Sequence, residues 1–319
     1  MRFSVCAWLL MAALCQAGPA QAQPSAESSG GAGAKEEGVN GEGASEGDAA
    51  DGGATEGEGP RALGLREKPV WEVGVVAGGG WLPDYPAADE NHFQGLALPY
   101  AIYRGDFFRL GDGGIARGLF VDRPWLELNI GLDASFPVDS SDNDAREGMD
   151  DLDYLLEAGP KLILKLLYDD AENDVDLSLA ARGVISTDFT SVDTVGFTVN
   201  PAVTYRRHDL FGQNLRASAS LGANFGSEGY NEYFYEVPKG DVRPDRPRYS
   251  ADAGYVGSEL TLGLSWGITD RLRLFGGTQI GFWTGSANED SPLFRDEVTY
   301  GVGGGLRWSF WVSERTVWR

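Results

Sequence analysis

The chain has 319 residues, and its 48 acidic side chains outnumber its 26 basic ones, for a formal net charge of −22. This balance argues against nucleic acid as a partner, because phosphates select basic surfaces. Both cysteines, Cys6 and Cys15, lie near the start, so we expect no disulfide in the rest of the chain. No apolar run reaches the roughly 18 residues that a membrane-spanning helix needs.

The first 22 residues have the pattern of a secretory signal peptide. Arg2 precedes an apolar run over residues 3–14, and residues 20–22 read Ala-Gln-Ala, a small-x-small cleavage site. Leu14 is too bulky for a lipoprotein signal at the cysteine that follows it. Cleavage removes one positive charge, that of Arg2, so the net charge of the exported chain changes from −22 to −23.

Residues 23–69 are rich in Gly, Ala, Ser and Glu and contain hardly any large apolar side chain. Such a segment buries too little apolar surface to offset the entropy lost on ordering, so we predict a disordered, acidic periplasmic extension. Two roles remain open for it: a solvated tail, or a tether for a periplasmic partner.

From Trp71 onward, apolar and polar residues alternate with period two, the pattern of strands with one apolar and one polar face. We assign residues 70–312 to one β domain and residues 313–319 to a short C-terminal tail. About twelve strands are expected, over residues 71–77, 96–104, 107–110, 115–121, 126–136, 152–168, 175–189, 195–206, 215–225, 259–266, 272–282 and 298–310.

The clearest alternation lies in residues 152–168 and 175–189, which we interpret as a hairpin. The first segment also fits an apolar helical stripe with charges opposite. Gly159-Pro160 at its centre disfavours that alternative, because an interior proline costs a helix about 3 kcal/mol.

The loops alternate in length along the chain. Long connections are expected at 82–95, 138–151, 226–250 and 285–296, and short turns on the other side. This pattern is typical of an all-β, up-and-down antiparallel barrel in the outer membrane, with both termini in the periplasm. A soluble sandwich is disfavoured, because its strands are rarely as long as residues 152–168.

Charged residues recur on the face of the strands that would point into the barrel. They can form a salt-bridge network that fills the lumen, or they can line a narrow polar path for a small solute. The predicted lumen-lining residues are Glu127, Asp133, Asp153, Glu157, Lys161, Lys165, Arg182, Asp188, Arg206, Arg216, Glu259, Arg273 and Arg307.

Little in the sequence points to catalysis. His92 and His208 are the only histidines, and they should lie on opposite sides of the membrane. A serine hydrolase built on His92 at the outer rim is the enzymatic alternative, but we expect no enzyme, no cofactor and no metal site. The acidic run 139–153 could bind a divalent cation, although such runs are usually solvated.

Five short stretches of the chain form a pattern that can be compared with known families. They include Pro83-Asp84-Tyr85-Pro86, Leu98-Pro99 with Tyr103-Arg104-Gly105, and Asn231-Glu232-Tyr233-Phe234 with Val237-Pro238. The other two contain the motif residues Arg146, Gly148, Met149, Asp151, Leu152, Asp153, Glu157, Gly159, Pro160, Ser291, Pro292 and Leu293. In this order, the five stretches resemble the MipA/OmpV family of outer-membrane proteins.

The resemblance implies a barrel in contact with outer-membrane lipid and without known catalysis. It implies a scaffold for murein-remodelling enzymes, with a periplasmic lytic transglycosylase and a murein synthase as partners. The alternative that it implies is a narrow porin, or a binding protein for small solutes or antibiotics. A hydrolase with its active site at the outer rim is the third hypothesis for the function.

Overall fold

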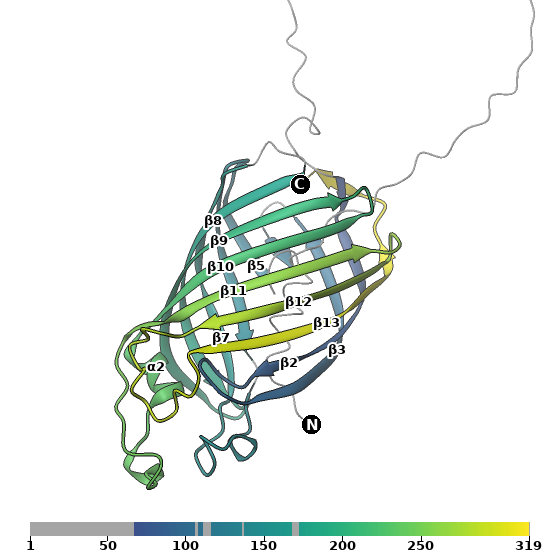
Figure 1. Cartoon of the computed structure of the whole chain (residues 1–319). Helices are drawn as coiled ribbons and strands as arrows, with labels where there is room; N and C mark the ends of the chain where they lie inside the picture. Colours follow the sequence, from purple (N-terminus) through teal and green to yellow (C-terminus); the bar gives the residue numbers. More distant parts are fainter. Residues whose placement is uncertain (1–66, 106–107, 111–115, 136, 168–171, 319) are drawn as a thin grey trace, which may run out of the picture.

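The computed structural model describes residues 67–105, 108–110, 116–135, 137–167 and 172–318. The predicted signal peptide and residues 23–66 of the predicted extension lie outside the described residues. The all-β prediction is confirmed, because twelve antiparallel strands close into one barrel (Figure 1). None of the helices in the described ranges is long and apolar enough to cross a membrane.

Every barrel strand pairs with its neighbour in the chain, and the last strand closes on the first. The strands are β2 (Trp71–Pro83), β3 (Asn91–Arg104), β4 (Phe108–Leu110), β5 (Ala116–Asp122), β6 (Leu126–Ser135), β7 (Tyr154–Lys165), β8 (Asn173–Thr187), β9 (Val192–Leu210), β10 (Leu215–Gly226), β11 (Gly254–Gly267), β12 (Leu272–Phe282) and β13 (Val298–Val312).

The predicted hairpin is confirmed as β7 and β8, with Leu162 opposite Leu179. The helical alternative for this segment is wrong. The register of β7 with β8 omits Gly159 and Pro160, which suits a proline without a backbone N–H. A side chain at position 159 would meet the carbonyl oxygen of Ala181 at 2.0 Å, so the close approach of β8 requires glycine here.

The outer face of the barrel is an apolar belt between two groups of exposed aromatic side chains. At one end, Trp71 and Tyr103 stack with their ring centroids 4.4 Å apart. At the other end, Phe225 and Tyr255 lie 5.5 Å apart. Large apolar side chains such as Leu264 are exposed between these groups. Aromatic girdles around an apolar band are the surface that a barrel presents to lipid.

The two ends of the barrel differ. One end, which we call the capped end, holds the long loops after β2, β6, β10 and β12, with the helices η1 (Ser140–Asp142), α2 (Glu228–Tyr235) and η2 (Lys239–Asp241). The opposite end, the terminal end, holds short turns and the C-terminus (Figure 1). Some strands reach further into the loops than the sequence indicates, since β3 starts at Asn91 and β11 at Gly254.

A small second sheet lies outside the barrel at the terminal end. In it, β1 (Glu67–Pro69) pairs antiparallel with β14 (Thr316–Trp318). Residues 67–69, which we assigned to the disordered extension, instead form a strand with residues 316–318 of the short C-terminal tail. Their backbones pair with each other, and Thr316 Oγ1 donates a 2.7 Å hydrogen bond to the Glu67 carboxylate.

Candidate functional site

The long loops at the capped end pack together into a hydrophobic core, which we call the cap. Tyr235 and Val237 from the connection after β10 and Leu293 from the loop after β12 are fully buried in it. The buried members are Tyr85, Ala87, Ala88, Val138, Leu152, Leu155, Val184, Val195, Phe234, Tyr235, Val237, Ala251, Val256, Trp283 and Leu293. Burial of this many apolar side chains holds the loops in one arrangement over the barrel mouth.

Buried hydroxyl groups link the cap loops to one another. Tyr85 donates to the carbonyl of Leu293 at 2.9 Å, and Tyr235 donates to that of Pro86 at 3.1 Å. Ser291 donates to the carbonyl of Tyr235 at 2.8 Å. Three loops are therefore joined pairwise, and loop carbonyls that would otherwise be buried without a partner are satisfied.

Arg146 is a buried cation of the cap. It donates to the carbonyl of Phe234 at 3.3 Å, to that of Asp150 at 3.2 Å and to Ser140 Oγ at 3.2 Å. Its guanidinium lies 5.9 Å from the centre of the Tyr85 ring. Burial lowers the pKa of Arg146 and raises that of Tyr85. Arg146 thus fastens its own loop to α2.

The acidic run 139–153 serves the loop fold. Asp139 caps η1 by accepting from the backbone of Ser141, and Asp151 accepts from the backbone N–H of Ser140 at 2.8 Å. In the described part of the chain, no three His, Cys, Asp or Glu residues gather as metal ligands would. These contacts give Asp139 and Asp151 structural roles in the loop.

His92 lies at the capped end of β3, as a rim residue. Its Nδ1 is 2.8 Å from Asp84 Oδ1, and the second oxygen of Asp84 accepts from Asn143 Nδ2 at 2.8 Å. No hydrogen bond joins His92 to a serine or threonine hydroxyl in the part of the chain that is described. The contact between Asp84 and His92 therefore joins the loop after β2 to the start of β3. His208 lies near the terminal end and contacts Asp174.

The family-motif residues, distant in sequence, meet at this end. Arg146, Met149, Leu152, Ser291 and Leu293 contribute to the cap, with Pro292 between the last two. Leu152 lies outside β7, although the sequence prediction begins that strand at residue 152: it bridges to Val138 and is 3% exposed. Gly148 adopts a φ of +79°, which favours glycine. Glu157, Gly159 and Pro160 follow on β7.

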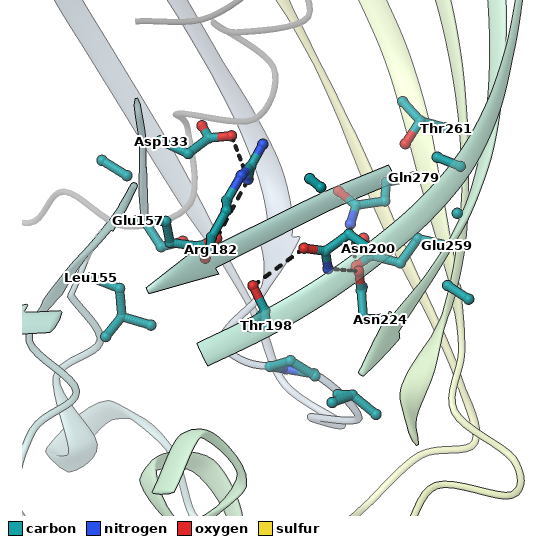
Figure 2. Close-up of a pocket in the computed structure, with 18 of the residues that line it drawn as sticks. Asp133, Leu155, Glu157, Arg182, Thr198, Asn200, Asn224, Glu259, Thr261 and Gln279 are labelled. Atoms are coloured by element: carbon teal, nitrogen blue, oxygen red, sulfur yellow. Dashed lines mark hydrogen bonds and ion pairs between the residues drawn. The ribbon is translucent and has the colours of Figure 1, made fainter. Parts of the chain in front are cut away.

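Beneath the cap lies a chamber of about 410 Å³ within the barrel. Tyr230, Phe234 and Trp283 of the cap form its roof, and polar side chains of the strands form its walls. Figure 2 shows Arg182 between two carboxylates, 2.9 Å from Asp133 and 3.4 Å from Glu157. Lys161 lines the same chamber, and its charge also acts on Asp133.

A second polar group covers the other wall of the chamber. Gln279 Nε2 donates to Glu259 Oε1 at 2.8 Å, and Asn200 Nδ2 donates to Asn224 Oδ1 at 2.7 Å (Figure 2). The partners of Glu259 are the amides of Gln279 and Asn224, and neither is basic. This wall is therefore rich in hydrogen-bonding groups that could face a polar solute.

The structure places the predicted lumen charges in several groups. Glu127 and Lys165 lie 3.8 Å apart, and Arg216 is buried. The prediction that Asp188 lines the lumen is wrong. Asp188 lies in the exposed turn after β8, where its carboxylate accepts hydrogen bonds from Thr190 and Ser191. Arg273 and Arg307 line a second pocket at the terminal end. The other seven line the chamber: Asp133, Asp153, Glu157, Lys161, Arg182, Arg206 and Glu259.

The list of predicted lumen charges omitted three charged side chains of the interior, those of Glu72, Arg104 and Asp176. Glu72 lies 2.8 Å from Arg104, and Asp176 lies 2.5 Å from Arg206. The alternation of β2 did mark Glu72 as polar among apolar neighbours, which is the signal that could have identified it. Arg104 stands at the end of its strand, where the alternation of apolar and polar residues no longer indicates on which face of the strand a side chain lies.

A closed barrel with an apolar belt and aromatic girdles defines an outer-membrane β-barrel protein. Within this class, the family model "MltA-interacting protein MipA" matches residues 75–310. The chain belongs to this family. No curated protein matched the chain.

Solved structures with a related outline are outer-membrane proteins of low similarity. A bacterial polysaccharide outer membrane secretin has 8% identity and a TM-score of 0.36, covering 75% of this chain and 98% of its own. Outer membrane phospholipase A from Escherichia coli has 13% identity and a TM-score of 0.29, covering 78% and 95%. The CymD monoaromatic hydrocarbon channel has 9% identity and a TM-score of 0.32, covering 76% and 89%. Scores this low carry no argument about function.

Proposed function

We propose that this protein is a non-enzymatic outer-membrane scaffold that binds a periplasmic murein-remodelling enzyme of the MltA type. The observation that carries the proposal is membership of the MltA-interacting family over residues 75–310. The cap of packed loops supports it, since a barrel with one mouth covered is less suited to conduct solutes than an open one.

The proposal includes an orientation. Outer-membrane barrels have short turns toward the periplasm and long loops outside. The terminal end, with its short turns and the β1–β14 sheet, then faces the periplasm, where a lytic transglycosylase and a murein synthase act. Phe211 is 84% exposed on the turn between β9 and β10, and such an exposed aromatic is a suitable anchor for a partner.

The test is capture of purified murein enzymes by the full-length protein in detergent. We expect Phe211→Ala at the terminal end to weaken capture of the transglycosylase. Phe189→Ala is the matched control, because Phe189 is also exposed and also has a positive φ but lies at the capped end. If neither the full chain nor a form lacking residues 23–66 captures any murein enzyme, the scaffold proposal is wrong.

A second function, binding of a small cationic solute, is favoured by one observation in the chamber. Its lining includes five carboxylates, those of Asp84, Asp133, Asp153, Glu157 and Glu259, against three basic side chains, those of Lys161, Arg182 and Arg206. Conductance of the barrel in a planar bilayer tests whether solutes pass. If the barrel is silent and binds no polycationic drug, this second function is excluded.

We also propose that the protein is not an enzyme. His92 is oriented by Asp84 but has no hydroxyl nucleophile at hydrogen-bond distance in the described part of the chain. Replacement of His92 by alanine should leave lipid and peptide turnover at the background level of the intact protein. A turnover that is measurable in the intact protein and lost in this variant would show an active site.

A further inference from the structure

One edge of β3 is largely left open in the wall of the barrel. Along its edge toward β2, β3 pairs from Asn91 to Tyr103. Along its other edge only Tyr103 and Arg104 pair, with β4 at the terminal end. From residue 95 to residue 102 this second edge has no partner strand in the described part of the chain, over a length of about 23 Å.

The neighbouring hairpin is too short to cover this edge. β4 ends at Leu110, which pairs directly with Ala116 at the start of β5. The chain between these two residues can extend the hairpin by only about two positions of β3. The next strand, β6, pairs with β5 only as far as Leu132 but continues to Ser135. On the capped-end side of the hairpin, β3 and β6 therefore face each other across a gap.

Loop contacts close this gap toward the capped end. Asn143 Nδ2 donates to Asp84 Oδ2 at 2.8 Å, and the backbone N–H of Asp144 donates to Glu90 Oε1 at 2.7 Å. Both bonds join the loop after β6 to the loop before β3. The gap is thus framed by β3, β6, the β4–β5 hairpin and these two loops, and we call it the window.

The window lies within the apolar belt. Phe93, which is 68% exposed, lies beyond one end of the open edge, and Tyr103 of the terminal aromatic pair lies beyond the other. Leu98 is opposite Val76 in the register, so both side chains lie on the inner face of the wall. Ile102, on the same face of β3, is fully buried, whereas Leu98 is 46% exposed. This contrast indicates that the wall is open beside Leu98.

The chamber reaches the window along β6. Its lining takes in consecutive residues of β6, 131–135, and therefore both faces of this strand. Successive side chains of a strand point to opposite faces, so a cavity meets both faces around an edge that no neighbouring strand covers. By contrast, β8 is paired along both edges and contributes only every second residue, namely Ser178, Ala180 and Arg182.

A polar cavity behind the open edge makes that edge tolerable in a membrane. Backbone N–H and C=O groups that face only lipid have no partner, and such edges survive at membrane depth only where they border protein or a cavity that admits water. Pro99 also stands in this edge and removes one donor, as prolines at sheet edges do. The window thus combines an apolar rim with a polar interior, which is the chemistry that an amphiphile requires.

We propose that the window is a lateral entrance through which amphiphiles with a cationic head group pass from the outer-membrane lipid into the chamber. The head group lies in the chamber, and the alkyl chain remains in the window against the lipid. The charge of this ligand rests on the second function proposed above, the binding of cationic solutes. The route rests on the pairing of the strands alone.

The head group has a suitable position beside Glu259. The partners of this carboxylate are the neutral amides of Gln279 and Asn224, so its charge is available to a cation. Tyr230 contributes an aromatic ring to the roof, and such rings attract quaternary ammonium groups. Burial raises the pKa of the Tyr230 phenol, and the charges of Glu157 and Glu259 raise it further, which places both carboxylates near this ring.

The experiment uses the chain from residue 23 onward, reconstituted in vesicles of phosphatidylethanolamine and phosphatidylglycerol. The photo-reactive residue benzoylphenylalanine replaces either Leu98 in the window or Leu264 on the lipid-facing surface. Dodecyltrimethylammonium is the probe, and mass spectrometry measures its adducts. We expect adducts at both positions. Glu259→Gln should reduce those at Leu98 by about tenfold, because the head group loses its counter-charge, and should leave those at Leu264 unchanged.

The matched control ligand is N,N-dimethyldodecylamine N-oxide, which has the same alkyl chain and no net charge. Its adducts at Leu98 should not depend on Glu259. Tyr230→Leu is a second variant, which removes the aromatic ring and should also reduce the adducts of the cationic probe at Leu98. Heat-modified migration on a gel reports whether each barrel is folded.

Absence of probe adducts at Leu98, or adducts that both folded variants leave unchanged, would overturn the lateral entrance. Calorimetric titration with tetramethylammonium, the head group without a chain, separates this result from the second function. If tetramethylammonium binds and Leu98 gives no adduct, the chamber binds cations but the window is not their entrance. If the adducts at Leu98 depend on Glu259 and no water-soluble cation binds, the entrance stands and the second function is contradicted.

Discussion

The two ends of this barrel are closed by different physical means. At the capped end, apolar side chains from several loops bury one another, and hydroxyls such as that of Tyr85 satisfy the loop carbonyls. At the terminal end, the interior is occupied by buried charges, among which Glu72 holds Arg104 and Arg307. The cap resembles the core of a small soluble domain, whereas the terminal end resembles a charged binding site.

The comparison shows that apolar packing closes the barrel at one end, whereas buried charges occupy its interior at the other. Hydrophobic burial is non-directional, so the cap can lose one contact and still cover the mouth. A buried ion pair fails abruptly when one partner is removed, because the remaining charge is uncompensated. Substitutions at the terminal end should therefore affect stability more per residue than those at the capped end.

The largest effect is expected from Glu72→Gln. It leaves Arg104 and Arg307 buried without their shared carboxylate, which costs about 3–5 kcal/mol of unfolding free energy. Urea unfolding followed by tryptophan fluorescence measures it. Glu314→Gln, an exposed carboxylate near the same end, is the control and should change little. A cost for Glu72→Gln no larger than that of the control would refute the contrast between the ends.

Leu293→Ala tests the cap and should have the next largest effect. Leu293 is fully buried there, so its truncation should cost about 3 kcal/mol and loosen the loops. Protease cleavage within residues 227–253 should accelerate, while the barrel stays folded. Val242→Ala, an exposed apolar residue in that loop, should leave cleavage unchanged. Unchanged cleavage in Leu293→Ala would mean that the loops do not depend on a shared core.

Tyr85→Phe separates hydrogen bonding from burial in the cap. It removes only the 2.9 Å bond to the Leu293 carbonyl, so we expect a loss of about 1 kcal/mol. Tyr300→Phe is the control, because that ring is 62% exposed on the outer face. If the Tyr85 variant is as damaging as Leu293→Ala, hydrogen bonds rather than apolar packing dominate the cap.

The smallest effect concerns pH, and it should have opposite signs at two aspartates. Burial and neighbouring carboxylates raise the pKa of Asp153, so its contribution is stabilising at acid pH and is lost as the pH rises through the folded pKa. Hydrogen bonds from Thr190 and Ser191 lower the pKa of Asp188, so its contribution is present at neutral pH and is lost on acidification.

Unfolding measured between pH 3 and 7 (about the range in which carboxylates titrate) compares Asp153→Asn with Asp188→Asn. The stability of the first variant relative to the unsubstituted protein should fall as the pH is lowered, and that of the second should rise. Slopes of the same sign would contradict the assigned environments of the two carboxylates.

The strands could be predicted from the sequence because each carries its own signal. In β7, Leu156 and Leu162 face outward while Glu157 and Lys161 line the chamber, and this alternation is local. The closure of the barrel followed from the number of strands and from the alternation of loop lengths.

The cap could not be predicted in this way. Tyr85, Tyr235 and Leu293 stand between the barrel strands, in segments without period-two alternation, and the core that buries them is assembled from several loops. Their contacts join positions more than 50 residues apart, such as Ser291 with Tyr235. The family motifs indicated that these loops matter to the family, but a single sequence does not show that separate motifs pack into one core. The pairing of β1 with β14 was missed for the same reason.

That pairing has a consequence for how the chain could be rewired. Glu67 and Trp318 are directly opposite in the two-stranded sheet, so their Cα atoms lie about 5 Å apart. A linker of a few residues could join them, and new ends could be opened in the turn at residues 211–214, as in a circular permutation. Each strand would keep its neighbours, and the seam between β13 and β2 would become a covalent connection like any other in the barrel.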